Sequence, residues 1–266
     1  MTSILDEAKE MDQVKRENYL IKAFIIGESG SGKSTSAALT LPGKKLFLDY
    51  DMRGESLAGY ADVKVIQFPE SNPRSPSAWD KAEKVKDLLW MQYRAGKLEY
   101  QSIIEDGLSS MNRVCMYWAL LLDPKRGLGG SPAKQHYGPH IKNLQDHIIS
   151  MISLPVNYVL TGHFNHVKDE ETGGIKYLPK VYGEQFRTDL PGMFNEVYLT
   201  YHATDEKSKH EKYYWHTSGF GRYDFMKSSL NQLGKYWDDP VEIDLDEAPA
   251  GFNKLLMLRF DKGEPK

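Results

Sequence analysis

The residues best suited to chemistry lie together in one short segment near the N-terminus. Gly27, Gly32, Lys33 and Ser34 match the pattern G-x-x-x-x-G-K-[ST] of a phosphate-binding loop, or P-loop. Glycines let successive backbone N–H groups point at phosphate oxygens, the lysine can reach the β- and γ-phosphates, and the serine hydroxyl can ligate Mg²⁺. The sequence therefore predicts that ATP and Mg²⁺ are bound by Gly27, Glu28, Ser29, Gly30, Ser31, Gly32, Lys33, Ser34 and Thr35.

The segments on either side of this loop supply the structure that the motif needs. An apolar run at 21–26 predicts a strand, and a helix is expected from Lys33 to Leu39. The positive end of the helix dipole at Lys33 would add to the anion site. A glycine turn without a ligand is the alternative, and the order of strand, loop and helix disfavours it.

A P-loop needs a second carboxylate that holds Mg²⁺ through water, and this group normally stands at the end of a neighbouring apolar strand. The run Ser102–Asp106 fits, and it ends in two adjacent acids, Glu105 and Asp106. Adjacent side chains of a strand point to opposite faces, so only one of these acids can face the nucleotide. We predict that Asp106 holds Mg²⁺ together with Ser34, and the sequence leaves Glu105 open as the alternative.

Hydrolysis also needs a group that orients the attacking water. The predicted strand at 45–49 leads to Asp51, which we predict for this role, with Asp49 and Glu55 as neighbouring acids. The alternative is that these acids cap the turn at 52–54.

The apolar strand at 156–161 ends in a polar cluster formed by Thr161, His163 and Asn165. In a parallel sheet, ligands bind outside the carboxyl ends of the strands, so this cluster would lie beside the P-loop. We predict that His163 contacts the γ-phosphate and reports its loss, with Thr161 and Asn165 as the next candidates.

Composition sets further limits. The chain has 266 residues, 40% of them hydrophobic, and a formal net charge of −3, which fits one large globular domain with additions. This charge gives no global sign of nucleic-acid binding, so such a surface would be local. The single cysteine, Cys115, excludes an intrachain disulfide and fits a reducing cytoplasm. We expect a buried role for Cys115, no signal peptide, no membrane span and no membrane partner.

Strands and helices alternate through the first part of the chain. Strands are predicted at 21–26, 45–49, 63–68, 102–106 and 156–161, and helices at 33–39, 77–95, 108–122 and after a Gly/Pro-rich loop at 123–138. This alternation predicts an α/β fold with a mostly parallel central sheet flanked by helices. Beyond a polar segment at 165–186, β-rich runs at 196–202, 212–216 and 222–226 predict antiparallel strands that extend one edge.

The chain divides into three predicted regions. Residues 1–19 carry a helix at 3–18 that either packs on its own domain or docks on a neighbouring copy as an oligomerisation arm. Residues 20–237 form the core. Residues 238–266 begin with many acids and no base, which predicts an acidic C-terminal tail that is solvated or competes with nucleic acid for a basic site.

Two segments carry cations interleaved with aromatic side chains, a combination that suits single-stranded nucleic acid because cations meet phosphates and rings stack on bases. The alternative is ordinary solvated loops. The candidate nucleic-acid contacts are Lys125, Arg126, Lys134, His136 and Tyr137 in the first segment, and Lys168, Lys176, Lys180 and Arg187 in the second.

Several segments resemble RecA-type recombinases, and more closely the phage ATP-binding proteins of AAA type that are tied to single-strand annealing. The similarity covers roughly residues 20–230, and its specific part runs from His163 to Pro191. The segments that carry it are 27–35, 46–51, 103–109, 154–163, 171–191 and 194–198.

The resemblance implies a RecA-like P-loop fold and a DNA-stimulated ATPase. It places Asp51 where RecA-like proteins keep a catalytic glutamate, and Glu105 where these families usually have an apolar residue. It implies single-stranded DNA contacts at 124–138 and 165–186, and a Lys227 that reaches the γ-phosphate of a neighbouring subunit. The implied partners are single-stranded DNA, further copies of the chain in a filament or ring, and a single-strand binding protein, in the cytoplasm of a phage-infected bacterium.

Two other functions stay open on the sequence alone. A P-loop motor or loader of helicase or packaging type would show directional translocation. A nucleotide-dependent assembly switch without nucleic acid would fit the modest net charge.

Overall fold

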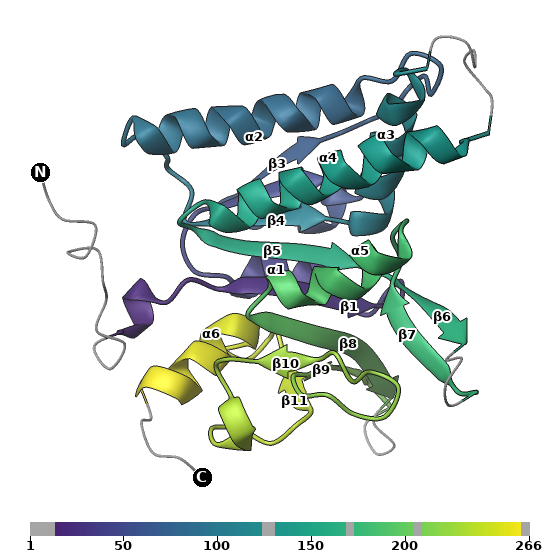
Figure 1. Cartoon of the computed structure of the whole chain (residues 1–266). Coiled ribbons are helices and arrows are strands. Elements are labelled where there is room, and N and C mark those ends of the chain that lie inside the picture. Colours follow the sequence, from purple (N-terminus) through teal and green to yellow (C-terminus); the bar gives the residue numbers. More distant parts are fainter. Residues whose placement is uncertain (1–13, 124–130, 169–172, 205–208, 262–266) are drawn as a thin grey trace, which may run out of the picture.

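The computed structural model describes residues 14–123, 131–168, 173–204 and 209–261 (Figure 1). Its main element is a nine-stranded sheet with the strand order β11-β9-β8-β1-β5-β4-β2-β3, and β10 pairs with β8 beside this path. The strands are β1 (Lys22–Gly27), β2 (Lys45–Asp49), β3 (Val63–Gln67), β4 (Ser102–Asp106), β5 (Asn157–Gly162), β8 (Glu196–Thr204), β9 (Glu211–His216), β10 (Lys227–Ser228) and β11 (Val241–Ile243).

The middle of the sheet is parallel, from β3 through β2, β4, β5 and β1 to β8. On the β8 side, β9 pairs antiparallel with β8, β11 with β9, and β10 with β8. The carboxyl ends of the parallel strands therefore meet at one edge, where ligands bind in such sheets. The expected fold class, a mostly parallel sheet flanked by helices with antiparallel strands at one edge, is confirmed.

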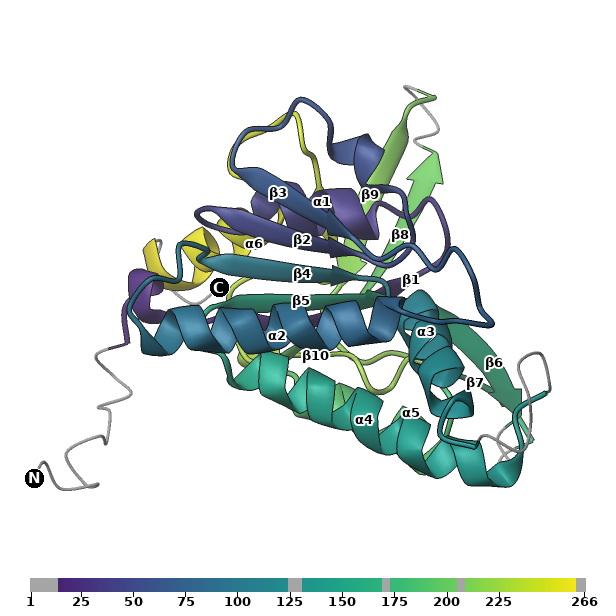
Figure 2. The same cartoon turned by 90° about the horizontal axis from the view of Figure 1, so that it is seen from above.

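Helices cover both faces of the sheet (Figures 1 and 2). The strands are buried on both sides, so in β1 the side chain of Phe24 joins one hydrophobic core and that of Ile25 joins the other. The first core is completed by α2 (Ala78–Arg94), α3 (Leu108–Leu120), α4 (Lys134–Ser153) and α5 (Glu184–Asp189), and the second by α1 (Lys33–Thr40) and α6 (Gly251–Leu256).

Cys115 is buried and free, as expected. The described helices include none that is long and apolar enough to cross a membrane.

Shorter elements complete the fold. The short helical turns are η3 (Arg16–Asn18), η4 (Gly54–Leu57), η5 (Leu190–Met193), η6 (Gln232–Gly234) and η7 (Met257–Asp261).

The polar segment predicted at 165–186 is not a plain loop. It contains a two-stranded antiparallel hairpin of β6 (Phe164–Lys168) and β7 (Ile175–Pro179), and then the start of α5. The hairpin extends away from the main sheet at the end where β5 finishes (Figure 1). The residues of β6 alternate poorly, because its apolar side chains Phe164 and Val167 point to opposite faces, so the pattern did not predict a strand.

The loop predicted at 123–138 is also shorter than expected, because α4 begins at Lys134. Pro139 lies inside this helix. The imidazole of His136 stabilises the early start, since its Nδ1 accepts a hydrogen bond from the Ala133 N–H at 2.9 Å.

The prediction of a solvated tail from residue 238 is wrong for the part of the chain that the structure describes. Val241 and Ile243 are buried in β11, and Phe252 of α6 is fully buried against α1. Asp239 Oδ1 accepts a hydrogen bond from the Thr217 hydroxyl at 2.9 Å. The acids dominated the composition and obscured the alternating apolar residues between them.

Two further predictions need correction or fall outside the described residues. The expected strand at 222–226 is wrong, because this segment has only an isolated bridge between Phe220 and Tyr223, and the paired strand is β10. Of the predicted N-terminal helix, residues 1–13 lie outside the described residues, and residues 16–18 form the turn η3.

Candidate nucleotide site

The P-loop connects the end of β1 to the start of α1. Gly30 and Gly32 have φ angles of +81° and +82°, a region that favours glycine. Gly32 is the N-cap of α1 and no side chain caps this helix, so the first N–H groups of α1 remain free to bind an anion. A Cβ atom on Gly32 would also lie 3.0 Å from the Tyr213 ring.

Strand β8 fixes the loop from the side. Thr200 donates a hydrogen bond from Oγ1 to the Ser31 carbonyl at 2.6 Å. A Cβ atom on Gly27 would lie 2.5 Å from the Thr200 carbonyl oxygen, so this close approach requires glycine. Sequence reasoning did not identify Thr200, because its role depends on the register between β1 and β8.

Lys33 is folded back onto the loop. Its Nζ donates hydrogen bonds to the carbonyls of Gly27 at 3.1 Å and Glu28 at 2.5 Å. Burial lowers the pKa of Lys33 to about 8, although the nearby carboxylates of Asp106 and Asp51 act in the opposite direction. The amine therefore lies beside the anion site, where a bound phosphate would stabilise its charged form.

Asp106 faces the P-loop, as predicted. Its Oδ1 accepts hydrogen bonds from the Ser34 hydroxyl at 2.7 Å and from the Thr161 hydroxyl. Burial raises the pKa of Asp106, and the two hydroxyl groups oppose this shift. Glu105 points to the other face of β4, where Tyr50, Tyr158 and His147 contact it, so strand alternation separates the two acids as expected.

The donor set at Ser34 and Asp106 fits Mg²⁺. Both residues offer hard oxygen atoms, which Mg²⁺ prefers. A protein-bound Mg²⁺ usually also keeps several waters and binds substrate phosphates. Within the described ranges there is no group of three or more His, Cys, Asp or Glu side chains that could hold a metal ion by themselves. The remaining ligands would therefore come from phosphate and water.

The acids after β2 have different roles. Asp49 is fully buried, and its Oδ2 accepts hydrogen bonds from the Gly54 N–H at 2.7 Å and from Gln67 Nε2 at 3.2 Å. It caps the turn after β2, which was the alternative for these acids. Asp51 instead lines the cavity and points toward Gly107, while Glu55 is exposed on η4.

His163 lies directly between β5 and β6 and also lines the cavity. Its Nδ1 donates to the Gly27 carbonyl at 3.0 Å, so the neutral ring keeps a lone pair on Nε2. Burial, followed by the positive charge of Lys33, lowers the pKa of His163. Asn165, the other candidate here, lies on the hairpin strand β6.

These residues surround one cavity of about 350 Å³. It joins residues 29–36 of the P-loop and α1 to the predicted Asp51, Asp106, Thr161 and His163. One wall is apolar and comes from strands that sequence reasoning did not connect to the site, with Tyr213 directly opposite Ile243 in the register of β9 and β11. The lining residues that were not predicted from the sequence as site residues are Ser36, Arg53, Ser56, Gly107, Gly162, Thr200, Tyr213, Trp215, Ile243 and Leu245.

A protein-family model described as an AAA domain matches residues 20–224. The chain belongs to this AAA domain family. The P-loop, the Asp106 carboxylate and the family match identify a P-loop NTPase, and they imply ATP and Mg²⁺ as its ligands.

Comparison with solved structures finds distant similarity. A KaiC-like protein of Pyrococcus horikoshii is 12% identical with a TM-score of 0.35, over 73% of this chain and 76% of that one. The flagellar accessory protein FlaH of Methanocaldococcus jannaschii is 11% identical with a TM-score of 0.40, over 86% of this chain and 88% of that one. None of the curated proteins matches the chain.

Lys227 follows the residues that match the AAA domain model, and it does not line the nucleotide cavity of its own chain. It is exposed on β10 and pairs with Val197, three residues before Thr200 on β8. At about 3.3 Å per residue, its backbone lies on the order of 10 Å along the strand from the P-loop. The predicted contact with a neighbouring subunit stays a prediction.

The candidate nucleic-acid residues of the AAA domain have mixed positions. Lys125 and Arg126 lie outside the described residues. His136 is only 1% exposed and caps α4, so the prediction that it contacts nucleic acid is corrected. Lys134, Lys168, Lys176 and Lys180 are exposed, whereas Arg187 is half-buried and donates to the Val181 carbonyl at 3.2 Å.

The two segments predicted to bind nucleic acid meet in the fold. The ring of Tyr137, in the first turns of α4, lies 5.5 Å from the ring of Tyr182, which follows the hairpin. Tyr182 is exposed, and Tyr137 is half-buried. The start of α4 and the segment after β7 therefore form one continuous surface.

Proposed function

We propose that this AAA domain hydrolyses ATP with Mg²⁺, binds single-stranded DNA as an oligomer, and promotes annealing or strand exchange in the cytoplasm of a phage-infected bacterium. The proposal is carried by one observation, the direct continuity between the nucleotide cavity and the hairpin β6–β7. His163 contacts the P-loop through its side chain and is followed at once by Phe164, the first residue of β6.

The residues of the cavity suit ATP hydrolysis. The uncapped N–H groups at the start of α1 and the ammonium of Lys33 bind phosphate oxygens. Ser34 and Asp106 supply oxygen atoms for Mg²⁺, which neutralises charge on the β- and γ-phosphates when it is bound. Asp51 accepts a hydrogen bond from the attacking water and orients it toward the γ-phosphate.

The continuity at His163 supports a coupling between nucleotide and DNA. The Lys180 N–H donates to the His163 carbonyl at 2.8 Å, so both ends of the hairpin are attached to the same residue. A shift of His163 on loss of the γ-phosphate would move β6 and β7 together. Lys168 and Lys176 lie on these two strands, where they would meet DNA phosphates.

The surface formed by α4 and the hairpin supports the choice of a single-stranded ligand. Cations at Lys134 and Lys180 suit a phosphate backbone, and the Tyr137 and Tyr182 rings suit stacking with unpaired bases. The resemblance to annealing proteins supports the same partner, together with a single-strand binding protein.

The position of Lys227 supports the oligomer. Because this lysine is exposed and lies away from its own cavity, its proposed role requires a neighbouring copy. ATP would then be held between two protomers in a filament or ring, and hydrolysis would release them.

The test is the ATPase rate of the purified chain with and without single-stranded DNA over a series of salt concentrations. We expect DNA to stimulate hydrolysis and DNA affinity to fall steeply with salt. The Lys33→Ala variant should lose nucleotide binding and, with it, assembly on DNA. Directional translocation would instead assign a motor or loader, and nucleotide binding without any response to DNA would assign an assembly switch.

A further inference from the structure

Glu105 lies at the centre of a buried polar network on the face of β4 that points away from the nucleotide cavity. Its side chain is 0% exposed. One carboxylate oxygen, Oε1, accepts hydrogen bonds from the Tyr50 hydroxyl at 3.1 Å and from His147 Nε2 at 2.8 Å. The other, Oε2, accepts a hydrogen bond from the Tyr158 hydroxyl at 2.6 Å.

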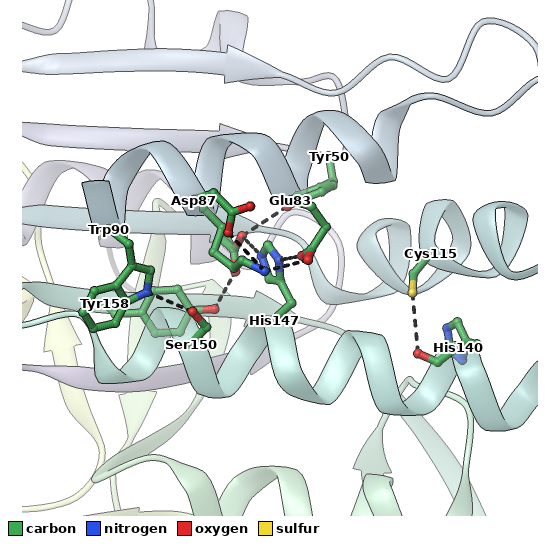
Figure 3. A network of polar contacts seen from close by, with 11 residues as sticks. Tyr50, Glu83, Asp87, Trp90, Cys115, His140, His147, Ser150 and Tyr158 are labelled. Carbon is green, nitrogen blue, oxygen red and sulfur yellow. Dashed lines mark hydrogen bonds and ion pairs between the residues drawn. The ribbon is translucent and has the colours of Figure 1, made fainter. Parts of the chain in front are cut away.

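The network continues outward as a row of alternating charges. Figure 3 shows His147 pointing from α4 toward Glu83 of α2, and the Nδ1 to Oε1 distance is 2.6 Å. Glu83 in turn pairs with Lys86 at 2.6 Å. Burial alone would lower the pKa of His147, but Glu105 and Glu83 outweigh it and raise the pKa to about 9. The imidazolium therefore links two carboxylates.

Each strand in this network leads directly into the nucleotide site. Tyr50 precedes Asp51 and Glu105 precedes Asp106. Tyr158 lies on β5, three residues before Thr161, whose hydroxyl contacts Asp106. The backbone repeats this connection, since the Tyr50 N–H donates to the Asp106 carbonyl at 2.6 Å. One buried carboxylate thus joins β2, β4 and β5 just below the cavity.

A buried ionic group needs an explanation other than stability. Replacing such a cluster by well-packed apolar residues is often neutral or stabilising, because desolvation of the charges is costly. A buried ionic group at this position can instead fix the geometry of the chain next to Asp106.

We propose that Glu105 is a positioning residue, which holds the ends of β2, β4 and β5 so that Asp106 and Asp51 stay aligned with Ser34 for Mg²⁺ and water. The inference rests on the proposed function, because it concerns the same Mg²⁺-nucleotide site. It assigns Glu105 no contact with nucleotide or metal.

The test compares the affinity for a fluorescent ATP analogue with and without Mg²⁺ in the Glu105→Gln variant. Glutamine keeps the size of the side chain and removes its charge. A misplacement on the order of 1 Å can cost up to about a hundredfold in a positioned site, so we expect the gain in affinity from Mg²⁺ to fall about tenfold or more. Affinity without metal should change less than about twofold, since the P-loop contacts are untouched.

Glu196 provides the matched control. It is also a fully buried glutamate on a central strand, and it accepts hydrogen bonds from the Tyr19 hydroxyl at 2.9 Å and the Tyr198 hydroxyl at 2.6 Å. It lies at the start of β8, away from the cavity. Glu196→Gln should lower the melting temperature and leave the Mg²⁺ response unchanged.

A milder variant tests the same role if Glu105→Gln does not fold. Tyr50→Phe removes one hydrogen bond to Glu105 and should reduce the Mg²⁺ response in the same direction by a smaller factor. If Glu105→Gln and Glu196→Gln lower stability alike and both keep the native Mg²⁺ response, the positioning role is wrong. If the native chain binds no nucleotide, the proposed function fails first and this inference fails with it.

Discussion

The burial of Lys33 predicts a pH dependence of ATP binding that differs from that of an exposed lysine. Phosphate binding requires the ammonium form, and in the empty site its pKa is lowered to about 8. Nearby phosphates favour the charged form, so binding raises this pKa. Above the lowered pKa, binding must therefore take up a proton, and affinity must fall as the pH rises.

The expected size follows from the fraction of protonated lysine. With a pKa of about 8, roughly 90% of the amine is charged at pH 7 and roughly 10% at pH 9. The affinity for ATP should therefore fall about tenfold between these values, which corresponds to about 1.4 kcal/mol. The phosphates of the nucleotide do not contribute, because their second ionisation lies near pH 6.

Isothermal titration calorimetry at several pH values, with buffers of different ionisation enthalpy, measures both the affinity and the proton uptake. The Lys33→Arg variant is the control, since a guanidinium stays charged throughout this range and should bind more weakly but without the pH dependence. A native affinity that stays flat from pH 7 to about pH 9, with no proton uptake, would refute the reasoning, because Lys33 would then be fully charged in the empty site.

Three other outcomes follow from the site. Tyr213→Ala should weaken nucleotide binding by about 1–2 kcal/mol, or roughly 5- to 30-fold, because the ring lines the apolar wall beside Gly32. Tyr214→Ala, on the opposite face of β9, should leave binding unchanged, and fluorescence titration measures both variants. Lys227→Ala should reduce ATP hydrolysis by the assembled protein but leave nucleotide binding by the protomer unchanged. Steady-state hydrolysis rates and binding measured at low protein concentration distinguish the two. Lys235→Ala, at another exposed lysine, is the control. Replacing Lys168 and Lys176 together by alanine should weaken DNA binding. The magnitude of the slope of log affinity against log salt should fall by about 0.7 for each lysine, while Lys84→Ala on α2 should leave this slope unchanged.

The parts of the fold that the sequence predicts well are those with contiguous patterns. The strand 45–49 and the strand 102–106 occur with the expected bounds, because apolar runs buried on both faces have few other conformations. The choice of Asp106 over Glu105 also agrees with the structure, since strand alternation requires no knowledge of the neighbouring strands.

Other features depend on residues distant in sequence and could not be read locally. Thr200 and Tyr213 enter the cavity through the registers of β8 and β9. Ser77 lies at the N-cap position of α2, where serine often caps a helix, but its side chain makes no capping bond. Glu70 Oε2 instead accepts hydrogen bonds from the Ser77 N–H at 3.0 Å and the Ala78 N–H at 3.1 Å. Serine propensity indicates the start of the helix, but it does not show that Glu70, in the preceding loop, satisfies the helix end in place of the Ser77 side chain.

The position of β8 and β9 beside β1 has a consequence for synthesis on the ribosome. The P-loop is complete once residue 35 has been added, but Thr200, which clamps it, and Tyr213, which walls it, emerge much later. Until then β1 presents an open edge where β8 will pair. A nascent chain that ends before β8 therefore lacks residues that complete the nucleotide site, and we expect such truncated products to depend on chaperones rather than on nucleotide to avoid aggregation.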